Sequence, residues 1–364
     1  MPLANLTYCD LFCGCGGFSI GFKEAGFRPL GGIDVDKMAL ESYKLNITPR
    51  AWNKDVTDVF GMDFVRFIGE RPDIVLASPP CEGFSDANAG RIDDAWERLY
   101  SPPGSLTIEA IDWICDLDPR IGFIIENVPA IGDGPLAIYI ADELARIGYK
   151  KVYFNMIRAE RVGSASKRPR FFISNLKFEE PPEIPAYNRF KVVSPVLGHD
   201  AGVDDDKRAA VQSDTGDESI DEAEFEHCLV TVQDVLGDLP DPSDLHDFID
   251  HEPAPLSSER EKEILRLKWG NSLMQFEGSN GSMKNTWIRL HPFDIAPILM
   301  GKSTFIHPFV DRQLSIREYA RLQGFPDSYL FCGGFTEKKN QIGEAVSPLV
   351  ARYIARRILE GYPR

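Results

Sequence analysis

The sequence predicts an α/β fold: a mostly parallel, Rossmann-like sheet with helices on both faces, followed by a second, smaller and irregular domain. Up to about residue 175, apolar runs alternate with amphipathic stretches, and this alternation is typical of a parallel sheet covered by helices. A Gly-rich turn follows the first apolar run and begins a helix, as in sheets that bind nucleotides. The alternation stops at a proline-rich segment, 179–185, so a different architecture is expected after it.

The individual elements follow from local patterns. Short apolar runs bounded by turn residues predict strands, and apolar residues at a helical period predict helices. Residues 230–309 have short, irregular elements with Gly and Asn turns, and 314–359 is helical again. The expected strands are 6–9, 29–33, 51–53, 74–77, 121–125, 152–157 and 170–174, with helices such as 37–45 and 107–117 between them.

The chain of 364 residues has a net charge of −16, which argues against nonspecific attraction of its whole surface to nucleic acid. Much of the acidity lies in 200–226, which holds only two basic residues and is predicted to be an exposed loop. No apolar stretch is long enough to span a membrane, and the first residues do not resemble a secretion signal. The seven cysteines show no disulfide or zinc pattern. We therefore expect a reducing, cytoplasmic setting, a monomer, and no metal site.

Cys81 is the residue that points most directly to chemistry. It follows the apolar run 73–77 and the pair Pro79-Pro80, which cannot continue a strand. The sequence thus places a nucleophilic side chain on a stiff turn at the carboxyl end of a strand, where α/β sheets bind ligands.

The Gly-rich turn, 10–18, is predicted to approach a ligand with its backbone. The helix that it begins favours a carboxylate or phosphate at its N-terminus. The glycine spacing typical of dinucleotide binding is absent, so a methionine-derived cofactor fits better: its carboxylate would meet the helix, and Phe12 could lie against the sulfonium.

Acidic residues end successive predicted strands. Asp34 and Asp55 follow the second and third strands, and Glu126 follows the apolar strand 122–125. An acid at the end of the second strand commonly holds ribose hydroxyls. Because these strand ends lie at one edge of the sheet, we expect Glu126 to share a cleft with Cys81. Arg170, beside the last strand, is placed to point inward at an acceptor oxygen.

These blocks, in this order, resemble the DNA (cytosine-5)-methyltransferase family over nearly the whole chain. The Pro-Cys, Glu-Asn-Val and final blocks together make the resemblance highly specific. The matching segments are the cofactor loop at 10–18, the Pro-Cys motif at 78–85, the Glu-Asn-Val motif at 126–128, the arginine-pair motif at 167–170, the ninth motif at 312–327 and the tenth at 341–348.

The resemblance implies a division into domains. Residues 1–179 would form the first part of the catalytic, cofactor-binding domain, and 312–364 would return to it. Residues 180–311 would form the target recognition domain, with the acidic loop at about 199–229.

The resemblance also implies a mechanism. Cys81 would add to C6 of cytosine as a thiolate, which makes C5 nucleophilic enough to accept a methyl group. Glu126 would bond N3 and the exocyclic amine, and Arg170 would hold O2, with Arg168 as the second catalytic arginine. Because the target ring is inaccessible in a duplex, the base must be flipped out.

S-adenosyl-L-methionine is the implied cofactor, and double-stranded DNA is the implied partner. Phe12 would lie near the sulfonium, Asp34 on the ribose and Asp55 on the adenine amine. The implied cofactor contacts are Phe12, Gly14, Cys15, Gly17, Asp34, Val35, Asp55, Val56, Pro80, Leu106, Glu344 and Ala345.

The implied DNA contacts are Ser85, Asn285 and Arg289. Ser85 belongs to a loop that would close on DNA, whereas Asn285 and Arg289 could read bases, contact phosphates or simply be surface residues. The enzyme would work in restriction–modification beside a cognate restriction endonuclease, or alone, in a prokaryotic or viral setting.

Three residues depart from the family pattern. Ser166 stands where Gln is usual, Ser347 replaces a common Pro, and Glu344 replaces the usual Asn beside the methionine end of the cofactor. A carboxylate at 344 would repel the cofactor's carboxylate or pair with its amine, so we expect altered cofactor binding.

Three alternatives remain open from the sequence. The RNA-modifying branch of the family carries a Cys-Phe-Thr block, which is absent from 180–311. A non-catalytic DNA-binding relative would usually lack Cys81 or Glu126. An α/β oxidoreductase would leave the Pro-Cys turn unexplained.

Overall fold

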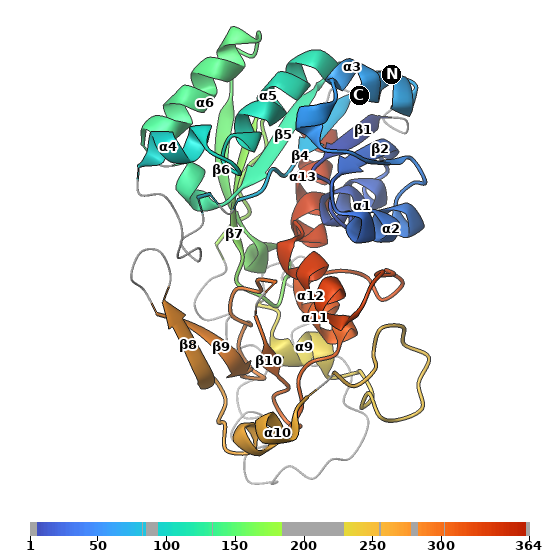
Figure 1. Ribbon diagram of the computed structural model, residues 1–364, viewed down its shortest axis with the longest axis vertical. Helices are drawn as coiled ribbons and strands as arrows, with labels where there is room; N and C mark the ends of the chain where they lie inside the picture. The colour runs from blue at the N-terminus through green and yellow to red at the C-terminus, as the bar shows by residue number, and fades with distance from the viewer. Residues whose placement is uncertain are drawn as a thin grey trace, which may run out of the picture.

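The computed structural model describes residues 6–81, 83–84, 94–132, 134–183, 229–254, 256–277, 283–301 and 303–361. They form two lobes, one above the other in Figure 1. The upper lobe is built on a seven-stranded sheet, and the lower lobe contains a three-stranded sheet. This arrangement confirms the predicted fold class.

The large sheet has the strand order β3-β2-β1-β4-β5-β7-β6. All neighbouring pairs are parallel except those of β7, which is antiparallel to β5 and β6. The order reverses between β1 and β4, and ligands bind at such switch points, at the carboxyl ends of the strands. The strands are β1 (Thr7–Leu11), β2 (Arg28–Asp34), β3 (Ala51–Asn53), β4 (Ile74–Ala77), β5 (Gly122–Asn127), β6 (Tyr153–Arg158) and β7 (Pro169–Ser174).

Helices cover both faces of this sheet because its central strands are apolar on both sides. In β4, Val75 and Ala77 pack on one face, and Ile74 and Leu76 pack on the other. One face is covered by α3 (Gly61–Ile68), α5 (Leu106–Leu117) and α6 (Pro135–Arg146); the other by α1 (Gly17–Glu24) and α13 (Pro348–Gly361). The other elements of this lobe are α2 (Lys37–Asn46), α4 (Ala95–Tyr100), η2 (Val56–Asp58), η3 (Pro129–Gly132) and η4 (Ala159–Val162).

The lower lobe is smaller and less regular. Its sheet has the order β10-β9-β8, with β8 antiparallel and β10 parallel to β9. Between the lobes lie α11 and α12. The elements are α9 (Val232–Leu236), α10 (Ser258–Ile264), β8 (Ser272–Glu277), β9 (Met283–Arg289), β10 (Phe305–Ile306), α11 (Ile316–Gln323) and α12 (Phe335–Glu344).

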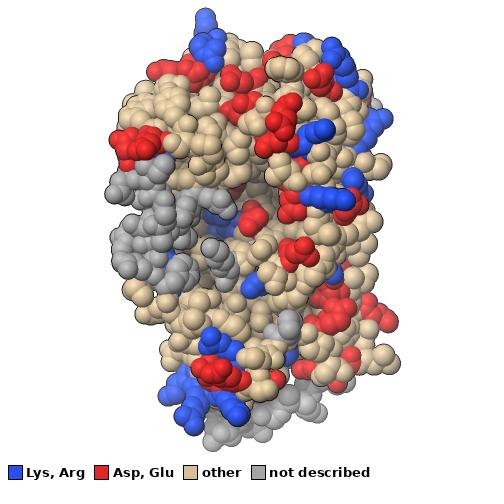
Figure 2. Space-filling view, viewed as in Figure 1, with Lys and Arg blue, Asp and Glu red and all other residues tan. Residues whose placement is uncertain are grey.

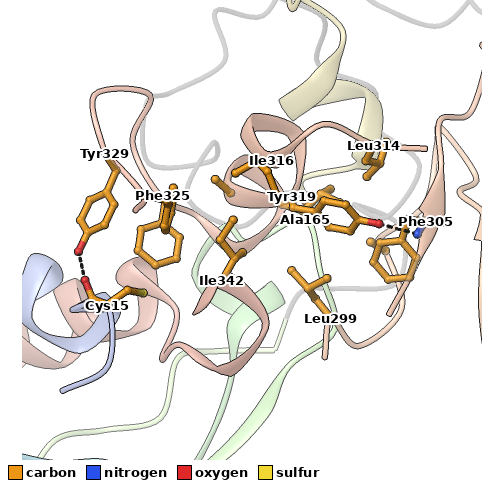
Figure 3. Close-up of a cluster of buried hydrophobic side chains, with 14 of the residues drawn as sticks. Cys15, Ala165, Leu299, Phe305, Leu314, Ile316, Tyr319, Phe325, Tyr329 and Ile342 are labelled. Atoms are coloured by element: carbon orange, nitrogen blue, oxygen red, sulfur yellow. Dashed lines mark hydrogen bonds between the residues drawn. The ribbon is translucent and has the colours of Figure 1, made fainter. Parts of the chain in front are cut away.

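One buried cluster joins the two lobes (Figure 3). Tyr329 donates a hydrogen bond to the carbonyl of Cys15 in the Gly-rich turn. At the other end of the cluster, the Phe305 amide donates to Tyr319 Oη at 2.8 Å. The core therefore continues from the β1 loop through α11 and α12 into the lower lobe.

The expected helical stretch 314–359 contains α11, α12 and α13. The domain boundaries at 179 and 311 stay predictions. No helix in the part of the chain that the structure describes combines the length and apolar character needed to cross a membrane.

Candidate active site

Three loops meet at the carboxyl edge of the large sheet, and side chains tie them together. Ser78 Oγ, after β4, donates to the carbonyl of Phe12, after β1, at 3.1 Å. Asn127, at the end of β5, donates through Nδ2 to the carbonyl of Pro79 at 3.3 Å. The Gly-rich turn, the Pro-Cys turn and the Glu-Asn-Val segment are therefore held at fixed positions relative to one another.

Cys81 lies half-buried on its turn, which is closed by a hydrogen bond from the Phe84 amide to the Cys81 carbonyl at 2.9 Å. Phe84 is fully buried and anchors this turn. By contrast, Cys9, Cys13 and Cys15 are buried, and burial raises the pKa of each thiol. A reactive thiolate needs an accessible, polar setting, which among these four cysteines only Cys81 has. Ser85 lies outside the described residues.

Glu126 and Arg170 form an ion pair beside this turn. Arg170 Nε lies 2.8 Å from Glu126 Oε1, and Glu126 is 7% exposed. Burial raises the pKa of Glu126, although the positive charges of Arg170 and Arg168 act in the opposite direction. A buried carboxyl with a raised pKa holds a proton more readily at neutral pH, so it can donate a hydrogen bond to an acceptor nitrogen.

Arg168 reaches the same region, but its guanidinium faces backbone. It is 1% exposed, and it donates from Nη1 to the Leu299 carbonyl at 2.7 Å and from Nη2 to the Ala345 carbonyl at 2.8 Å. Burial lowers the pKa of Arg168 to about 9, while the charges of Glu126, Cys81 and Glu344 favour the protonated form. It remains a cation at neutral pH.

The Gly-rich turn is held by Asp34. The Gly14 amide donates to Asp34 Oδ2 at 2.7 Å, and the Asp36 amide donates to Oδ1 at 2.8 Å. Burial raises the pKa of Asp34. Each carboxylate oxygen keeps a second lone pair that can accept a ribose hydroxyl.

The glycines of this turn have different roles. Gly14 has φ +49° and open space where a Cβ would stand, so its backbone is free to meet a ligand. A Cβ on Gly17 would lie 2.3 Å from the Val346 carbonyl, so this glycine permits close packing on the start of the C-terminal segment rather than close approach of a ligand. Only the amide of Gly17, at the N-terminus of α1, is suited to the cofactor contact that we predicted.

The other predicted cofactor residues line the same edge. Asp55 Oδ1 caps η2, accepting from the Thr57 amide and hydroxyl at 2.9 and 2.7 Å. Val35 is 62% exposed at the end of β2, whereas Val56 is buried. The exposed apolar side chain of Val35 is suited to packing against a planar ring. Phe12, Pro80, Leu106 and Ala345 are half-buried, and Glu344 is exposed at the end of α12.

Cys15 is enclosed rather than exposed. Its thiol lies in the core and contacts the Gln341 carbonyl at 3.5 Å, and burial raises its pKa to about 12. Any contact of Cys15 with a cofactor must come from its backbone.

One known protein family matches the chain over nearly its whole length. The model of the C-5 cytosine-specific DNA methylase family matches residues 6–360. The chain belongs to this family. A protein named as a type II methyltransferase in Methanocaldococcus jannaschii is 37% identical over 362 residues, covering 97% of this chain and 99% of the relative.

More distant relatives also match nearly the whole chain. The type II methyltransferase M1.HphI of Haemophilus parahaemolyticus is 27% identical, covering 98% of this chain and 87% of that protein. A crystal structure described as a prophage-encoded DNA modification methyltransferase from E. coli has a TM-score of 0.66 at 22% identity and covers 98% of this chain and 99% of its own. The methylase is thus an enzyme of DNA cytosine-5 methylation, as the sequence motifs predicted.

Two predicted DNA contacts of the methylase differ in their placement. Asn285 is exposed on β9, where it accepts from Gln275 Nε2 at 2.9 Å. Arg289 is 5% exposed, and its guanidinium donates to the carbonyls of Ile264 and His307 and to Asp311. A guanidinium committed to the interior cannot read a base, so the prediction for Arg289 does not fit the structure.

The surface of the methylase is hollowed between its lobes, and charged side chains of both signs lie in the hollow (Figure 2). Basic side chains also gather at the lower end of this view. On α10 and just after it, Arg260, Lys262 and Arg266 line a groove of about 430 Å³ together with Glu263, which pairs with Arg260 at 2.5 Å. Glu259 and Glu261 lie on the same short helix, so this surface carries charges of both signs.

Sequence reasoning left several contacts of the site unassigned. Asn127 joins two catalytic loops, and its position just after the apolar run 122–125 was the available signal. Ser347, which departs from the family pattern, donates to the Gln323 carbonyl at 2.9 Å. Gln323 in turn donates to the Ala345 carbonyl at 2.9 Å, so the end of α12 is held from two sides.

Asp10 is a buried carboxyl beneath the Gly-rich turn. Ser19 Oγ donates to its Oδ2 at 2.6 Å, and Oδ1 has no partner among the described residues. Burial raises the pKa of Asp10 to about 7. Between about pH 4 and 7, the folded state therefore keeps a proton that the unfolded chain has lost, and stability falls as pH rises, by about 1.4 kcal/mol per unit.

The Asp10→Asn variant is expected to lose this pH dependence, because an amide of similar shape does not ionise. Urea unfolding at pH 5 and pH 7 should show the wild type losing roughly 2–3 kcal/mol relative to the variant across this interval. Equal pH dependence in both proteins would mean that Asp10 is ionised in the folded state.

Proposed function

We propose that this methylase transfers a methyl group from S-adenosylmethionine to C5 of a flipped cytosine in duplex DNA, through a covalent bond to Cys81. The observation that carries this proposal is the position of Cys81. It is an accessible thiol on a closed turn, at the sheet edge where Arg170 holds a buried Glu126 at 2.8 Å. A nucleophile, an acid and a cation are thus available to one planar substrate.

Each group has a role that its surroundings support. The thiolate of Cys81 adds to C6, and Glu126, whose pKa is raised by burial, donates a proton or hydrogen bond to N3 as negative charge develops in the ring. Arg170 orients Glu126 and donates to O2 of the base. When C5 has gained its methyl group and lost its proton, the C6–sulfur bond breaks and Cys81 is released.

The residues of the sheet edge fit the cofactor. S-adenosylmethionine supplies an electrophilic methyl group when bound. Gly14 leaves open space beside the N-terminus of α1, which favours a carboxylate. Asp34 keeps lone pairs for ribose hydroxyls, and the exposed Val35 offers an apolar surface for the adenine.

Duplex DNA is the proposed partner, with residues 180–311 as the proposed target recognition domain. The hollow between the lobes (Figure 2) and the basic side chains Arg260, Lys262 and Arg266 on and after α10 support this, since phosphates need local positive charge in an acidic protein. Because relatives carry type II names, we further propose a role in restriction–modification. The monomeric state stays a prediction.

Covalent trapping tests the proposal. Sequencing the methylated cytosines in DNA from cells that express this chain identifies the target sequence. A duplex with 5-fluorocytosine at that position should then form a stable adduct with the protein in the presence of cofactor, because fluorine cannot leave as a proton does. A peptide other than the one containing Cys81 in the adduct, or the absence of adduct at a methylated site, would contradict the proposal.

Glu344→Asn is expected to bind S-adenosylmethionine more tightly, by about threefold or more, because it removes one charge facing the cofactor's carboxylate. The carboxylate of Glu344 also stands at the C-terminal end of α12, where negative charge is unfavourable. Calorimetric titration without DNA measures the affinity, with Glu360→Asn near the end of α13 as the control. Equal affinity in the wild type and Glu344→Asn would remove the proposed effect.

A further inference from the structure

A short set of backbone hydrogen bonds joins the large sheet to the lower lobe just before β7. The Ala296 amide donates to the Ala165 carbonyl at 2.7 Å, and the Lys167 amide donates to the Ala296 carbonyl at 2.9 Å. Ser166 and Ala296 form a parallel bridge between them. The segment that leads into Arg168 and Arg170 is therefore also the place where the second lobe is attached.

The side chain of Arg168 adds two hydrogen bonds to these backbone contacts. It donates to the Leu299 carbonyl, 131 residues away in the sequence, and to the Ala345 carbonyl, 177 residues away. Leu299 belongs to the lower lobe, and Ala345 follows α12 in the segment proposed to meet the cofactor. One planar guanidinium thus binds two different parts of the chain to the catalytic sheet.

The two bound segments also pack on each other. A Cβ on Gly343 would lie 2.5 Å from the amide nitrogen of Gly301 and 2.6 Å from the carbonyl carbon of Met300, so α12 and the turn after Leu299 are in close contact. Arg168, which holds both segments, lies two residues before Arg170, and Arg170 pairs with Glu126 at 2.8 Å. A shift of either segment would be transmitted to the catalytic groups.

We propose that Arg168 is a positioning residue that fixes the recognition lobe and the end of α12 relative to Cys81 and Glu126. Correct placement of the target DNA by the lower lobe thereby sets the rate of attack on the base. This inference rests on the roles proposed above for Cys81 and Glu126, and it replaces a direct contact of Arg168 with the base.

Lysine cannot replace this function. Arginine presents donors in a rigid, planar fork, whereas the lysine ammonium is a single point on a flexible stem. Arg168→Lys keeps the positive charge near Cys81 and Glu126 but holds only one of the two carbonyls. We call the hold of Arg168 on the two carbonyls the clamp. Arg168→Lys therefore tests the clamp separately from simple electrostatic support of the thiolate.

Arg317 provides a matched control. It is fully buried, and it donates to three carbonyls, those of Ile249, Pro326 and Tyr329, at 2.8–3.1 Å. None of these groups belongs to the proposed catalytic site. Arg317→Lys should cost stability to a similar extent without changing the chemistry of the folded protein.

The test compares single-turnover methylation by both variants and the wild type, below their unfolding temperatures, with saturating S-adenosylmethionine and target duplex. For Arg168→Lys we expect a fall of about thirtyfold in the rates of methyl transfer and of 5-fluorocytosine adduct formation. Its affinities for DNA and cofactor should stay within about threefold of the wild type. Arg317→Lys should react at the wild-type rate once folded.

If Arg168→Lys reacts as fast as the wild type, charge alone suffices and the clamp is refuted. If both lysine variants slow alike, Arg168 has only a general structural role. Failure of the wild type to form the adduct is a separate outcome, which rejects the proposed function and not the clamp alone.

Gln323→Met covers the case in which Arg168→Lys does not fold. Gln323 is the second donor to the Ala345 carbonyl, and its removal loosens that segment without a change of charge. We expect a fall of about fivefold in the single-turnover rate at unchanged DNA affinity, and an unchanged rate would contradict the proposal.

Discussion

Cys81→Ser is expected to reduce methyl transfer by at least about a thousandfold, which corresponds to roughly 4 kcal/mol of lost transition-state stabilisation. A serine hydroxyl does not ionise near neutral pH, so the covalent bond to C6 is not formed at a useful rate. DNA affinity should stay close to that of the wild type, because the turn is held by Phe84 and Asn127 rather than by the thiol. Single-turnover transfer of labelled methyl groups and gel detection of the 5-fluorocytosine adduct measure both effects.

Cys115→Ser is the matched control, since Cys115 is an exposed thiol on α5. It should keep both the wild-type rate and the adduct. Methyl transfer by Cys81→Ser at the wild-type rate would show that another nucleophile acts, or that no covalent intermediate forms.

Glu126→Gln is expected to lower the transfer rate by about a hundredfold or more. Glutamine keeps the shape and can accept from the exocyclic amine, but it cannot supply a proton to N3 as C6 is attacked. Glutamine also cannot form the ion pair that the ionised form of Glu126 makes with Arg170. Single-turnover rates of the two proteins, measured on the same duplex, give the ratio directly.

The pH dependence of the transfer rate is a second and independent test of the role of Glu126. Burial raises the pKa of Glu126, so the protonated, donating form persists to higher pH than in a free carboxyl. The wild-type rate should fall as the pH rises through this raised pKa, whereas Glu126→Gln should lack that descending limb. Glu143→Gln, on the outer helix α6, is the control and should reproduce the wild-type profile. A descending limb that survives in Glu126→Gln would assign it to another group.

Local patterns in the sequence were sufficient to predict the large sheet. The seven expected strands of residues 6–174 correspond to β1–β7, because each combines an apolar run with turn residues at its ends. The grouping of site residues at one edge of the sheet could also be predicted. Parallel strands bring their carboxyl ends together, so Cys81, Glu126 and Asp34 were expected near one another. Arg170 was expected to point inward, and it pairs with Glu126.

The partners of buried arginines could not be predicted in the same way. Arg168 and Arg289 both donate to backbone carbonyls that are distant in the sequence or lie in irregular segments. A carbonyl is present at every residue and leaves no compositional signal. The pattern therefore could not distinguish an arginine that faces a ligand from one that binds two segments of the chain together. The same reason applies to Gly17, whose close neighbour is a carbonyl in the C-terminal segment.

The packing of α13 against α1 has a consequence for how this chain can be divided. Leu6, which precedes β1, and Ile358 in α13 belong to the same buried cluster, and β1 and α13 lie in the same, upper lobe in Figure 1. A catalytic core assembled from both extremes of the sequence cannot be expressed as an N-terminal fragment alone, because α1 would present a bare apolar face.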